Sequence, residues 1–382
     1  MKSHGLYIHI PFCTKKCKYC AFFSGGINPE IEKLYLEALV KEFSERRREL
    51  PQSPDSIYIG GGTPSLLSES SLAILKEKII DLSSVGSGLK EFTIEVNPDD
   101  VNSDKIKFWK EIGVNRLSIG VQSFCDDELS LIGRRHNAKE AIAAYELAKN
   151  YFDNISIDLM YGLPRQTLQS FKKTLETATS LNPEHISSYW LSLEDKTPLK
   201  VLHDNGRIAL PDEETGVRMW RLLNETLYNE GFSHYEISNY AKPGKMALHN
   251  MKYWFGNPYL GLGPSAHSYD GGNIRRFNPS DLHGYIKYYL HNDSIEEKRS
   301  FYDEEKLSED EMREEFVFTR LRTKKGLSLI EFEREFGSKE KEKLMKGSLK
   351  YIEDGKMEII GHHLSFTEEG MLTSDNILLD LI

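Results

Sequence analysis

The sequence predicts an α/β protein, in which a parallel sheet closes part of a barrel and a smaller helical domain follows. Two observations predict this fold class. Short segments rich in Ile, Val, Leu and Tyr alternate six times with longer segments of helical period. The alternation stops near residue 232, and a charged segment of helical character begins near residue 303. Alternating strands and helices imply parallel strands, and right-handed crossovers curl such a sheet into a barrel or part of one.

The six strands and their helices can be placed from these patterns. The expected strands cover residues 5–10, 56–60, 91–96, 116–121, 154–160 and 185–191. The expected helices cover about 30–50, 68–82, a segment after 103, 138–151, a segment after 167, and about 213–230. In folds of this class the working residues lie at the C-terminal ends of the strands, so we expect a site there.

The chain changes character after the sixth unit. Residues 234–240 predict another strand, and residues 241–278 predict a loop-rich, aromatic stretch. The charged segment 303–315 is expected to open a helical region that ends in two short helices, a hairpin over 357–366 and a last helix. Helices followed by a hairpin indicate a winged-helix-like domain. The expected division is a core barrel at 1–232, a bridging region at 233–300 and a C-terminal domain at 301–382.

Composition excludes several classes of protein. The net charge is −10, so nucleic acid is not an expected partner. No apolar run is long enough to span a membrane. The sequence runs from Met1 directly into the first strand, so no signal peptide is expected. The four cysteines do not form a disulfide framework, and a reducing, cytoplasmic location is therefore expected.

Three of the four cysteines lie within eight residues, directly after the first strand: Cys13, Cys17 and Cys20. A four-iron, four-sulfur cluster takes one ligand per iron, so three thiolates would leave one iron open to a small molecule with an amine and a carboxylate. The alternative is a zinc site completed by His4 or His9. We disfavour zinc because zinc loops usually pair their cysteines as Cys-x2-Cys.

Other polar residues fall at successive strand ends. Glycines after the second strand allow a close backbone approach to a ligand, and the planar fork of Arg134 suits a carboxylate. Each charged side chain taken alone is more simply explained as a salt bridge or a solvated face. Gathered around one barrel mouth, they favour a cofactor site.

The Cys-x3-Cys-x2-Cys spacing, with Tyr19 before the last cysteine, resembles the radical S-adenosylmethionine (radical SAM) superfamily. The resemblance implies a partial (β/α)6 barrel that holds a [4Fe-4S] cluster and SAM. Longer strings, such as residues 7–13, 61–64, 120–124 and 158–164, resemble the anaerobic coproporphyrinogen dehydrogenase family and its relatives. In that family SAM is held at the positions matching Tyr7, Tyr19, Gly61, Gly62, Thr63, Glu95, Gln122, Arg134 and Asp158.

Two features separate the branches of this family. The dehydrogenases (HemN) carry a fourth cysteine where this chain has Phe22, and they have a longer N-terminal extension. The run from His249 to Trp254 is similar to the H-N-x-x-Y-W motif of the HemW-type haem chaperones. That resemblance implies haem as a ligand, His249 as the residue that binds its iron, and Tyr253 and Trp254 as flat surfaces for the porphyrin. Candidate cations for the haem propionates are Lys242, Lys245 and Lys252.

Two functional hypotheses remain. In the first, the chain is a haem chaperone that passes haem to an acceptor haem-protein, for example a respiratory protein of the membrane, and it can form a homodimer. In the second, it is a radical SAM enzyme, an oxygen-independent coproporphyrinogen III dehydrogenase. Phe22, the short N-terminus and the His249 motif favour the chaperone, while the SAM-binding residues keep the enzyme hypothesis open. The simplest alternative for His249 is a histidine that is hydrogen-bonded in a polar loop, with the aromatic residues in a nearby core.

Overall fold

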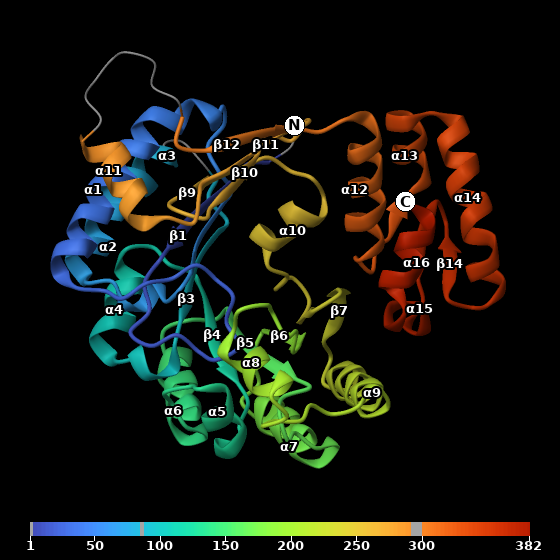
Figure 1. Cartoon of the computed structure of the whole chain (residues 1–382), viewed down its shortest axis with the longest axis horizontal. Coiled ribbons are helices and arrows are strands. Elements are labelled where there is room, and N and C mark those ends of the chain that lie inside the picture. Colours follow the sequence, from blue (N-terminus) through green and yellow to red (C-terminus); the bar gives the residue numbers. More distant parts are fainter. Residues whose placement is uncertain (1–2, 85–87, 292–299) are drawn as a thin grey trace.

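The computed structural model describes residues 3–84, 88–291 and 300–382. Figure 1 shows an open barrel of strands and outer helices, with the C-terminal helices to one side. The first six strands pair in parallel and in chain order, which confirms the fold predicted from the sequence. They are β1 (Gly5–Ile10), β2 (Ser56–Gly61), β3 (Glu91–Val96), β4 (Arg116–Gln122), β5 (Ile155–Tyr161) and β6 (His185–Trp190).

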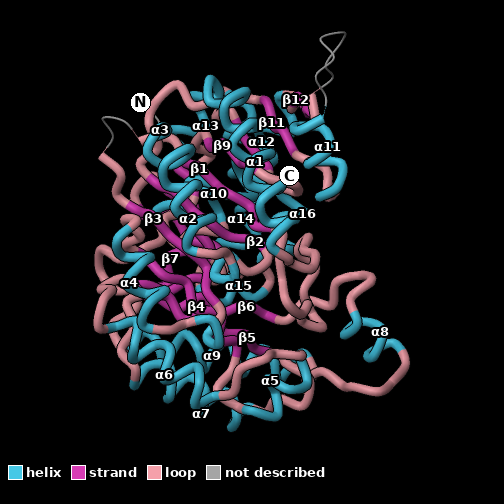
Figure 2. The backbone as a smooth tube through the Cα atoms, turned by 90° about the vertical axis from the view of Figure 1, so that its left-hand side faces the viewer, coloured by secondary structure: helices cyan, strands magenta, loops and turns pink. Residues whose placement is uncertain are grey.

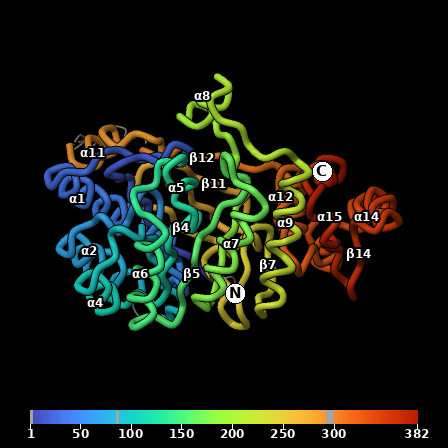
Figure 3. The backbone as a smooth tube through the Cα atoms, turned by 90° about the horizontal axis from the view of Figure 1, so that it is seen from below, coloured from blue at the N-terminus to red at the C-terminus, as the bar shows by residue number. Residues whose placement is uncertain are grey.

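Helices cover the outer face of this sheet, as Figure 3 shows from below. Apolar side chains of the strands, such as Ile57 and Ile94, are fully buried in the main core, and those of the helices, such as Leu39 and Phe171, pack into the same core. The helices are α1 (Pro29–Arg46), α2 (Glu69–Leu75), α3 (Asp81–Ser83), α4 (Ser103–Glu111), α5 (Asp126–Ile132), α6 (Ala138–Lys149), α7 (Leu168–Ser180), α8 (Pro198–Asp204) and α9 (Glu213–Asn229).

Local sequence explains where most of these helices begin. The side chains of Asn28, Ser68, Asn102, Asn137 and Thr167 each accept a hydrogen bond from a backbone N–H of the first turn. The short helix α8 was not predicted. Figure 2 shows α8 standing away from the barrel wall.

The bridging region differs from the prediction. Residues 234–240 form two antiparallel strands, β7 (Ser233–Glu236) and β8 (Asn239–Ala241), because the chain reverses between them, and β8 pairs with β6. The stretch expected to be loop-rich contains α10 (Leu248–Trp254), β9 (Tyr259–Leu262), β10 (His267–Tyr269) and β11 (Ile274–Phe277). These strands are too short to show a clear alternation. They extend the sheet beyond β1, and β9 is parallel to β1.

The helix α11 (Leu282–His291) and the strand β12 (Asp303–Lys306) complete the barrel part of the chain. The strand β12 pairs with β11, so the charged segment 303–315 opens with a strand rather than with a helix. Among the described residues, no helix is long and apolar enough to cross a bilayer.

The C-terminal residues have a core of their own, which includes Val317, Phe332 and Leu364. Three strands pair in the order β13-β15-β14, and the predicted hairpin turns at Gly361, whose φ is 63°. The hairpin lies where it was predicted, but α14 has 16 residues and is not short, a third strand joins the hairpin, and the predicted last helix is divided into two. The domain limits remain predictions. The elements are α12 (Glu309–Leu321), β13 (Leu327–Ser328), α13 (Leu329–Phe336), α14 (Ser338–Glu353), β14 (Met357–Ile360), β15 (His363–Phe366), α15 (Glu368–Leu372) and α16 (Ser374–Leu381).

Backbone hydrogen bonds connect the C-terminal helices to the bridging region. The amide of Ile237 donates to the carbonyl of Arg322 at 3.0 Å. The amide of Lys324 donates to the carbonyl of Tyr235 at 3.1 Å. The helices α10 and α12 are also in contact. The segment that carries the His249 motif therefore lies between the barrel and the C-terminal helices.

Candidate functional site

A cavity of about 390 Å³ lies at the C-terminal ends of the barrel strands. The three cysteines of the loop after β1 line it, which is where the fold class predicts a site. Of the nine residues predicted to hold SAM, eight line this cavity: Tyr19, Gly61, Gly62, Thr63, Glu95, Gln122, Arg134 and Asp158. The ninth, Tyr7, is not part of the cavity wall. Its ring stacks against that of Tyr58, and Tyr58 does line the cavity.

The cysteine loop is held in place by its backbone. The amide of Cys13 donates to the carbonyl of Gly25 at 2.8 Å, and the amide of Gly25 donates to the carbonyl of Pro11 at 2.8 Å. All three loop cysteines are free thiols and half-buried. Cys13 Sγ lies 3.3 Å from Thr63 Oγ1, and Cys17 Sγ accepts a hydrogen bond from Arg134 Nη1 at 3.5 Å. The guanidinium thus places positive charge next to the sulfur of Cys17.

The zinc alternative does not fit this geometry. His4 precedes β1, whereas the cysteines follow its other end. Both ring nitrogens of His9 are engaged, one with Tyr7 and one with the carbonyl of Phe23, each at 3.0 Å. Within the described parts of the chain, no three side chains of the types that bind metals are close enough to hold a single ion. Three thiols without a fourth protein ligand fit a cluster with one open iron.

Glycines at the end of β2 shape the wall beside the cysteines. Gly61 has a φ of 113°, which favours glycine, and a Cβ there would lie 2.7 Å from the ring of His9. A Cβ on Gly62 would lie 2.5 Å from the carbonyl oxygen of Phe12. The cysteine loop and the end of β2 can approach this closely only because both residues lack a side chain.

Two buried carboxyl groups lie deeper in the cavity. Glu95 accepts hydrogen bonds from Tyr58 at 2.7 Å and from the amide of Gly61 at 3.0 Å. Burial nevertheless raises its pKa to about 7. Asp158 accepts hydrogen bonds from the hydroxyls of Ser118 and Ser156, and burial raises its pKa as well. Both groups can accept hydrogen bonds from hydroxyl or amine groups of a ligand.

The strand β4 supplies a third side of the cavity. A bulge shifts its register between Gly120 and Gln122, and Gln122 has a φ of 70°. The side chain of Gln122 thereby lines the cavity. Arg134 donates to Asn97 Oδ1 at 2.7 Å and to the carbonyl of Gly120, while its buried Nε has no partner in the described ranges of the chain.

Sequence reasoning missed Arg116 and Asn250, which also line this cavity. Arg116 begins β4 and is 1% exposed, and its Nε has no hydrogen-bond partner among the residues that the structure describes. Burial acts to lower its pKa, but nearby Glu91 and other groups outweigh burial, and the pKa is raised. The only signal in the sequence was one cation at the start of a strand whose other residues carry no charge.

The residues of the His249 motif form the helix α10 instead of the expected loop. The carboxylate of Glu91 accepts hydrogen bonds from the amides of Leu248 at 2.7 Å and His249 at 3.0 Å, so it caps the helix. Asn250 points to the cavity at the barrel mouth, whereas Tyr253 and Trp254 line a second cavity. The helix is therefore part of the wall of both cavities.

His249 lies between these cavities and is fully buried. Its Nδ1 is hydrogen-bonded to Ser56 Oγ and its Nε2 to the hydroxyl of Tyr253, each at 3.0 Å. Burial and the nearby Lys252 lower its pKa to about 3, so the ring is neutral near pH 7. A neutral imidazole can bind iron. In this conformation, however, both nitrogens are engaged, and Tyr253 would have to release Nε2 first.

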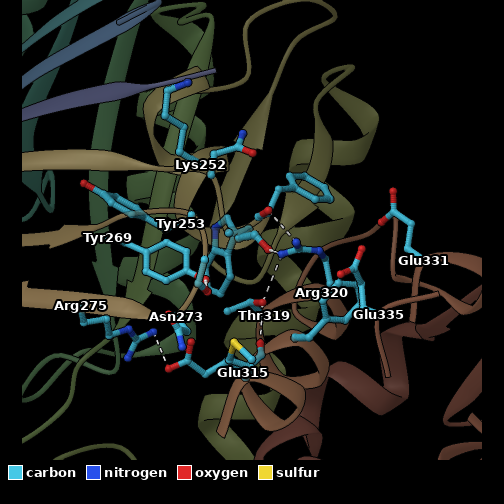
Figure 4. Close-up of a pocket in the computed structure, with 18 of the residues that line it drawn as sticks. Lys252, Tyr253, Tyr269, Asn273, Arg275, Glu315, Thr319, Arg320, Glu331 and Glu335 are labelled. Carbon is cyan, nitrogen blue, oxygen red and sulfur yellow. Dashed lines mark hydrogen bonds and ion pairs between the residues drawn. The ribbon is translucent and has the colours of Figure 1, made fainter. Parts of the chain in front are cut away.

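The second cavity measures about 940 Å³ and lies between α10 and the C-terminal helices α12 and α13. Figure 4 shows its side chains, with Arg320 near the centre and Arg275 paired with Glu315 at one side. The volume is at the upper end of that of ligand pockets, which is about 300–1,000 Å³. Its aromatic lining residues are Tyr253, Trp254, Phe255, Tyr259, Tyr269, Phe316 and Phe336.

Known protein families match the cysteine-containing barrel and the C-terminal domain described above. Residues 7–178 match the radical SAM superfamily, and residues 307–373 match the HemN C-terminal domain. The protein named heme chaperone HemW of Bacillus subtilis (strain 168) is 42% identical over 341 residues, which cover 88% of this chain and 87% of that protein. The chain belongs to the HemW family. The heme chaperone HemW of Lactococcus lactis (strain IL1403) is 37% identical over 336 residues, covering 88% and 86% of the two chains.

The fold of this HemW-family chain is also that of a solved structure. Coproporphyrinogen III oxidase (HemN) from Escherichia coli, described as a radical SAM enzyme, superposes with a TM-score of 0.81 at 23% identity, covering 100% of this chain and 90% of that chain. At this identity the likeness concerns the fold alone. It confirms the partial barrel followed by a C-terminal helical domain.

Proposed function

We propose that this HemW-family chain binds haem and transfers it to an acceptor haem-protein, with a SAM-ligated [4Fe-4S] cluster at the barrel mouth. The observation that carries the proposal is the position of the motif from His249 to Trp254. It lies on one helix that borders both the cysteine-lined cavity and an aromatic cavity large enough for a porphyrin. The two bacterial relatives described above are named heme chaperones.

At the barrel mouth, Cys13, Cys17 and Cys20 would hold three irons of the cluster. The fourth iron would be left for the amine and carboxylate of SAM, and Arg134 would contact that carboxylate. Glu95 and Asp158 would accept hydrogen bonds from the ribose or the amine. Bound in this way, the cluster would supply electrons to SAM.

For haem, the motif offers one imidazole and a flat aromatic wall. His249 would bind the iron once Tyr253 releases its Nε2, and Trp254 would cover part of the apolar macrocycle. The hydrogen bond between Tyr253 and His249 makes the ligand available only when the tyrosine moves. A protein that delivers haem needs a ligand that can be withdrawn again, and this arrangement would provide it.

The enzyme hypothesis, coproporphyrinogen III dehydrogenase, stays as the second candidate because the residues expected to hold SAM line one cavity. Phe22 argues against it. This residue stands where the dehydrogenases carry a fourth cysteine, and its side chain is 66% exposed at the rim of the cavity.

One experiment separates the two functions. The protein is reconstituted anaerobically with iron and sulfide and is then titrated separately with haem and with coproporphyrinogen, SAM and a reductant. We expect a Soret band that His249→Ala shifts or removes while the iron–sulfur absorption persists, and no multiple-turnover decarboxylation. Sustained formation of protoporphyrinogen would make the protein an enzyme, and failure of the unmutated protein to bind haem would refute the chaperone proposal.

The partners are proposed on the same basis. Haem is the cargo, and a haem-protein is the acceptor, with respiratory proteins of the membrane as first candidates. A homodimer remains a prediction, which sedimentation of the reconstituted protein would test.

A further inference from the structure

The lysines expected to pair with haem propionates are engaged elsewhere. Lys252 Nζ bonds Asp55 Oδ1 at 2.5 Å and the hydroxyl of Ser3 at 2.8 Å. Lys242 bonds the side chain of Asn182, and Lys245 bonds the carbonyl of Asp153. Of the three, only Lys252 lines the aromatic cavity. Its ammonium points away from the centre of the cavity in Figure 4.

Arg320, on α12, supplies a different cation to the same cavity. It is 8% exposed, and its guanidinium lies 5.0 Å from the ring centroid of Phe255 and 4.7 Å from that of Phe316. Nη1 donates to the carbonyl of Trp254 and Nη2 donates to that of Phe255 at 2.6 Å, as the dashed lines in Figure 4 show. Within the described part of the chain, its buried Nε has no hydrogen-bond partner.

No carboxylate among the described residues forms an ion pair with Arg320. The other arginines of the cavity are paired, Arg275 with Glu315 at 2.6 Å and Arg334 with Glu335 at 2.8 Å. A buried charge is costly unless it is paired. Burial lowers the pKa of Arg320 to about 10, although the nearby Glu331 acts to raise it.

The simplest alternative is that Arg320 only caps α10. A cation near the last carbonyls of a helix is favourable, and Trp254 and Phe255 end this helix. Capping accounts for the two terminal nitrogens. Among the described residues it leaves Nε without a partner and the charge without an ion-paired carboxylate, since Glu331 of the same cavity acts on Arg320 electrostatically but forms no ion pair with it. A ligand with a carboxylate would supply both, and it would sit beside the aromatic walls that suit a porphyrin.

We propose that Arg320 binds one propionate of a haem held between α10 and α12. The inference rests on the proposed haem-chaperone function and names the residue that recognises the polar edge of the cargo. Because Arg320 belongs to the C-terminal domain while the iron ligand His249 belongs to the bridging region, one haem would contact both parts of the chain.

The test compares haem with haem dimethyl ester, in which both propionates are neutral. Reconstituted wild-type protein and the Arg320→Gln variant are titrated with each compound, and the Soret band reports binding. A charge-assisted hydrogen bond contributes enough that we expect the variant to bind haem about tenfold more weakly. We expect it to bind the dimethyl ester as wild type does, and we expect wild type to prefer haem to the ester.

The Arg322→Gln variant is the matched control. Arg322 lies two positions along the chain, pairs with Asp375 and does not line the cavity, so haem affinity should not change. The Arg320→Lys variant keeps the charge without the planar fork and should show a smaller, equally selective loss. This variant decides the question if the Gln variant does not fold.

Three outcomes separate the possibilities. Equal loss of haem and ester binding would mean that Arg320 only caps α10, and it would overturn the inference while leaving the chaperone proposal intact. Unchanged binding of both compounds would overturn it as well. Absence of haem binding in the wild type would instead refute the proposed function itself, and the inference with it.

Discussion

The hydrogen bond between His249 and Tyr253 gives a sharp test of how this HemW-family chain would bind iron. Nε2 of His249 is 3.0 Å from the tyrosine hydroxyl, and this bond must break before the nitrogen can bind a metal. The variant Tyr253→Phe removes the hydroxyl but keeps the ring. We therefore expect it to bind haem more tightly than the wild type.

The expected gain in haem affinity follows from the hydrogen bond between His249 and Tyr253, which the variant does not have to break. A neutral hydrogen bond contributes about 1 kcal/mol net, which corresponds to a roughly fivefold change in affinity. The ring packs edge-on against Tyr259 with centroids 4.8 Å apart, and Phe preserves this contact, so no cavity term enters. The unfolding free energy of the haem-free protein should fall by about the same 1 kcal/mol, because the buried Nε2 is left without a partner.

The assay is an anaerobic haem titration followed at the Soret band, together with urea unfolding of the haem-free protein. Tyr285→Phe is the control, because it removes the hydrogen bond of a buried tyrosine to Glu42 and lies outside both cavities. It should destabilise the fold without changing haem affinity. Weaker haem binding by Tyr253→Phe, or loss of the axial-ligand spectrum, would refute the reasoning and assign the hydroxyl a direct role in holding haem.

Three further predictions concern the barrel mouth. Replacing Cys13, Cys17 or Cys20 by Ala should abolish the brown iron–sulfur absorption after reconstitution, whereas Cys125→Ala should not; loss of the cluster in Cys125→Ala would contradict the three-ligand site. Arg134→Ala should weaken SAM binding by about 2 kcal/mol, roughly 30-fold in calorimetry, because a charge-assisted hydrogen bond is lost. If the protein without its cluster bound SAM equally well, that result would argue against an open iron. Because burial raises the pKa of Glu95 from 4.5 to about 7, the folded state holds its proton more tightly and the unfolding free energy should fall as the pH rises through this range. The variant Glu95→Gln should lack this part of the fall in urea unfolding, and an identical pH profile would show that Glu95 does not titrate there.

The sequence by itself determined the barrel and the cysteine-lined site. The strands could be predicted because their apolar residues lie close together in the chain. Ile57 and Ile59 of β2 are an example, and both are fully buried. The cysteine loop could be predicted because its three thiols lie within eight residues, so their proximity does not depend on how distant segments pack. Residues such as Glu95 and Asp158 could be placed because parallel strands bring their C-terminal ends to one edge.

Tertiary structure alone decided the surroundings of His249. The helix α10 has only seven residues, and its N-terminus is capped by Glu91, which lies more than 150 positions earlier in the chain. A helix this short is marginal without such contacts, so local pattern indicated a loop. The partners of the imidazole, Ser56 and Tyr253, likewise come together only when β2 packs against this helix.

The same reason hid Arg320 from sequence analysis. Nothing near it in the chain distinguishes it from the other cations of an acidic helix. It becomes distinctive only where α12 meets the end of α10, because there it is buried, bound to two carbonyl groups and without a carboxylate partner among the described residues. Sequence periodicity specifies which elements form and which faces they bury. The environment of a single buried charge depends on elements far apart in the chain, and only their packing determines it.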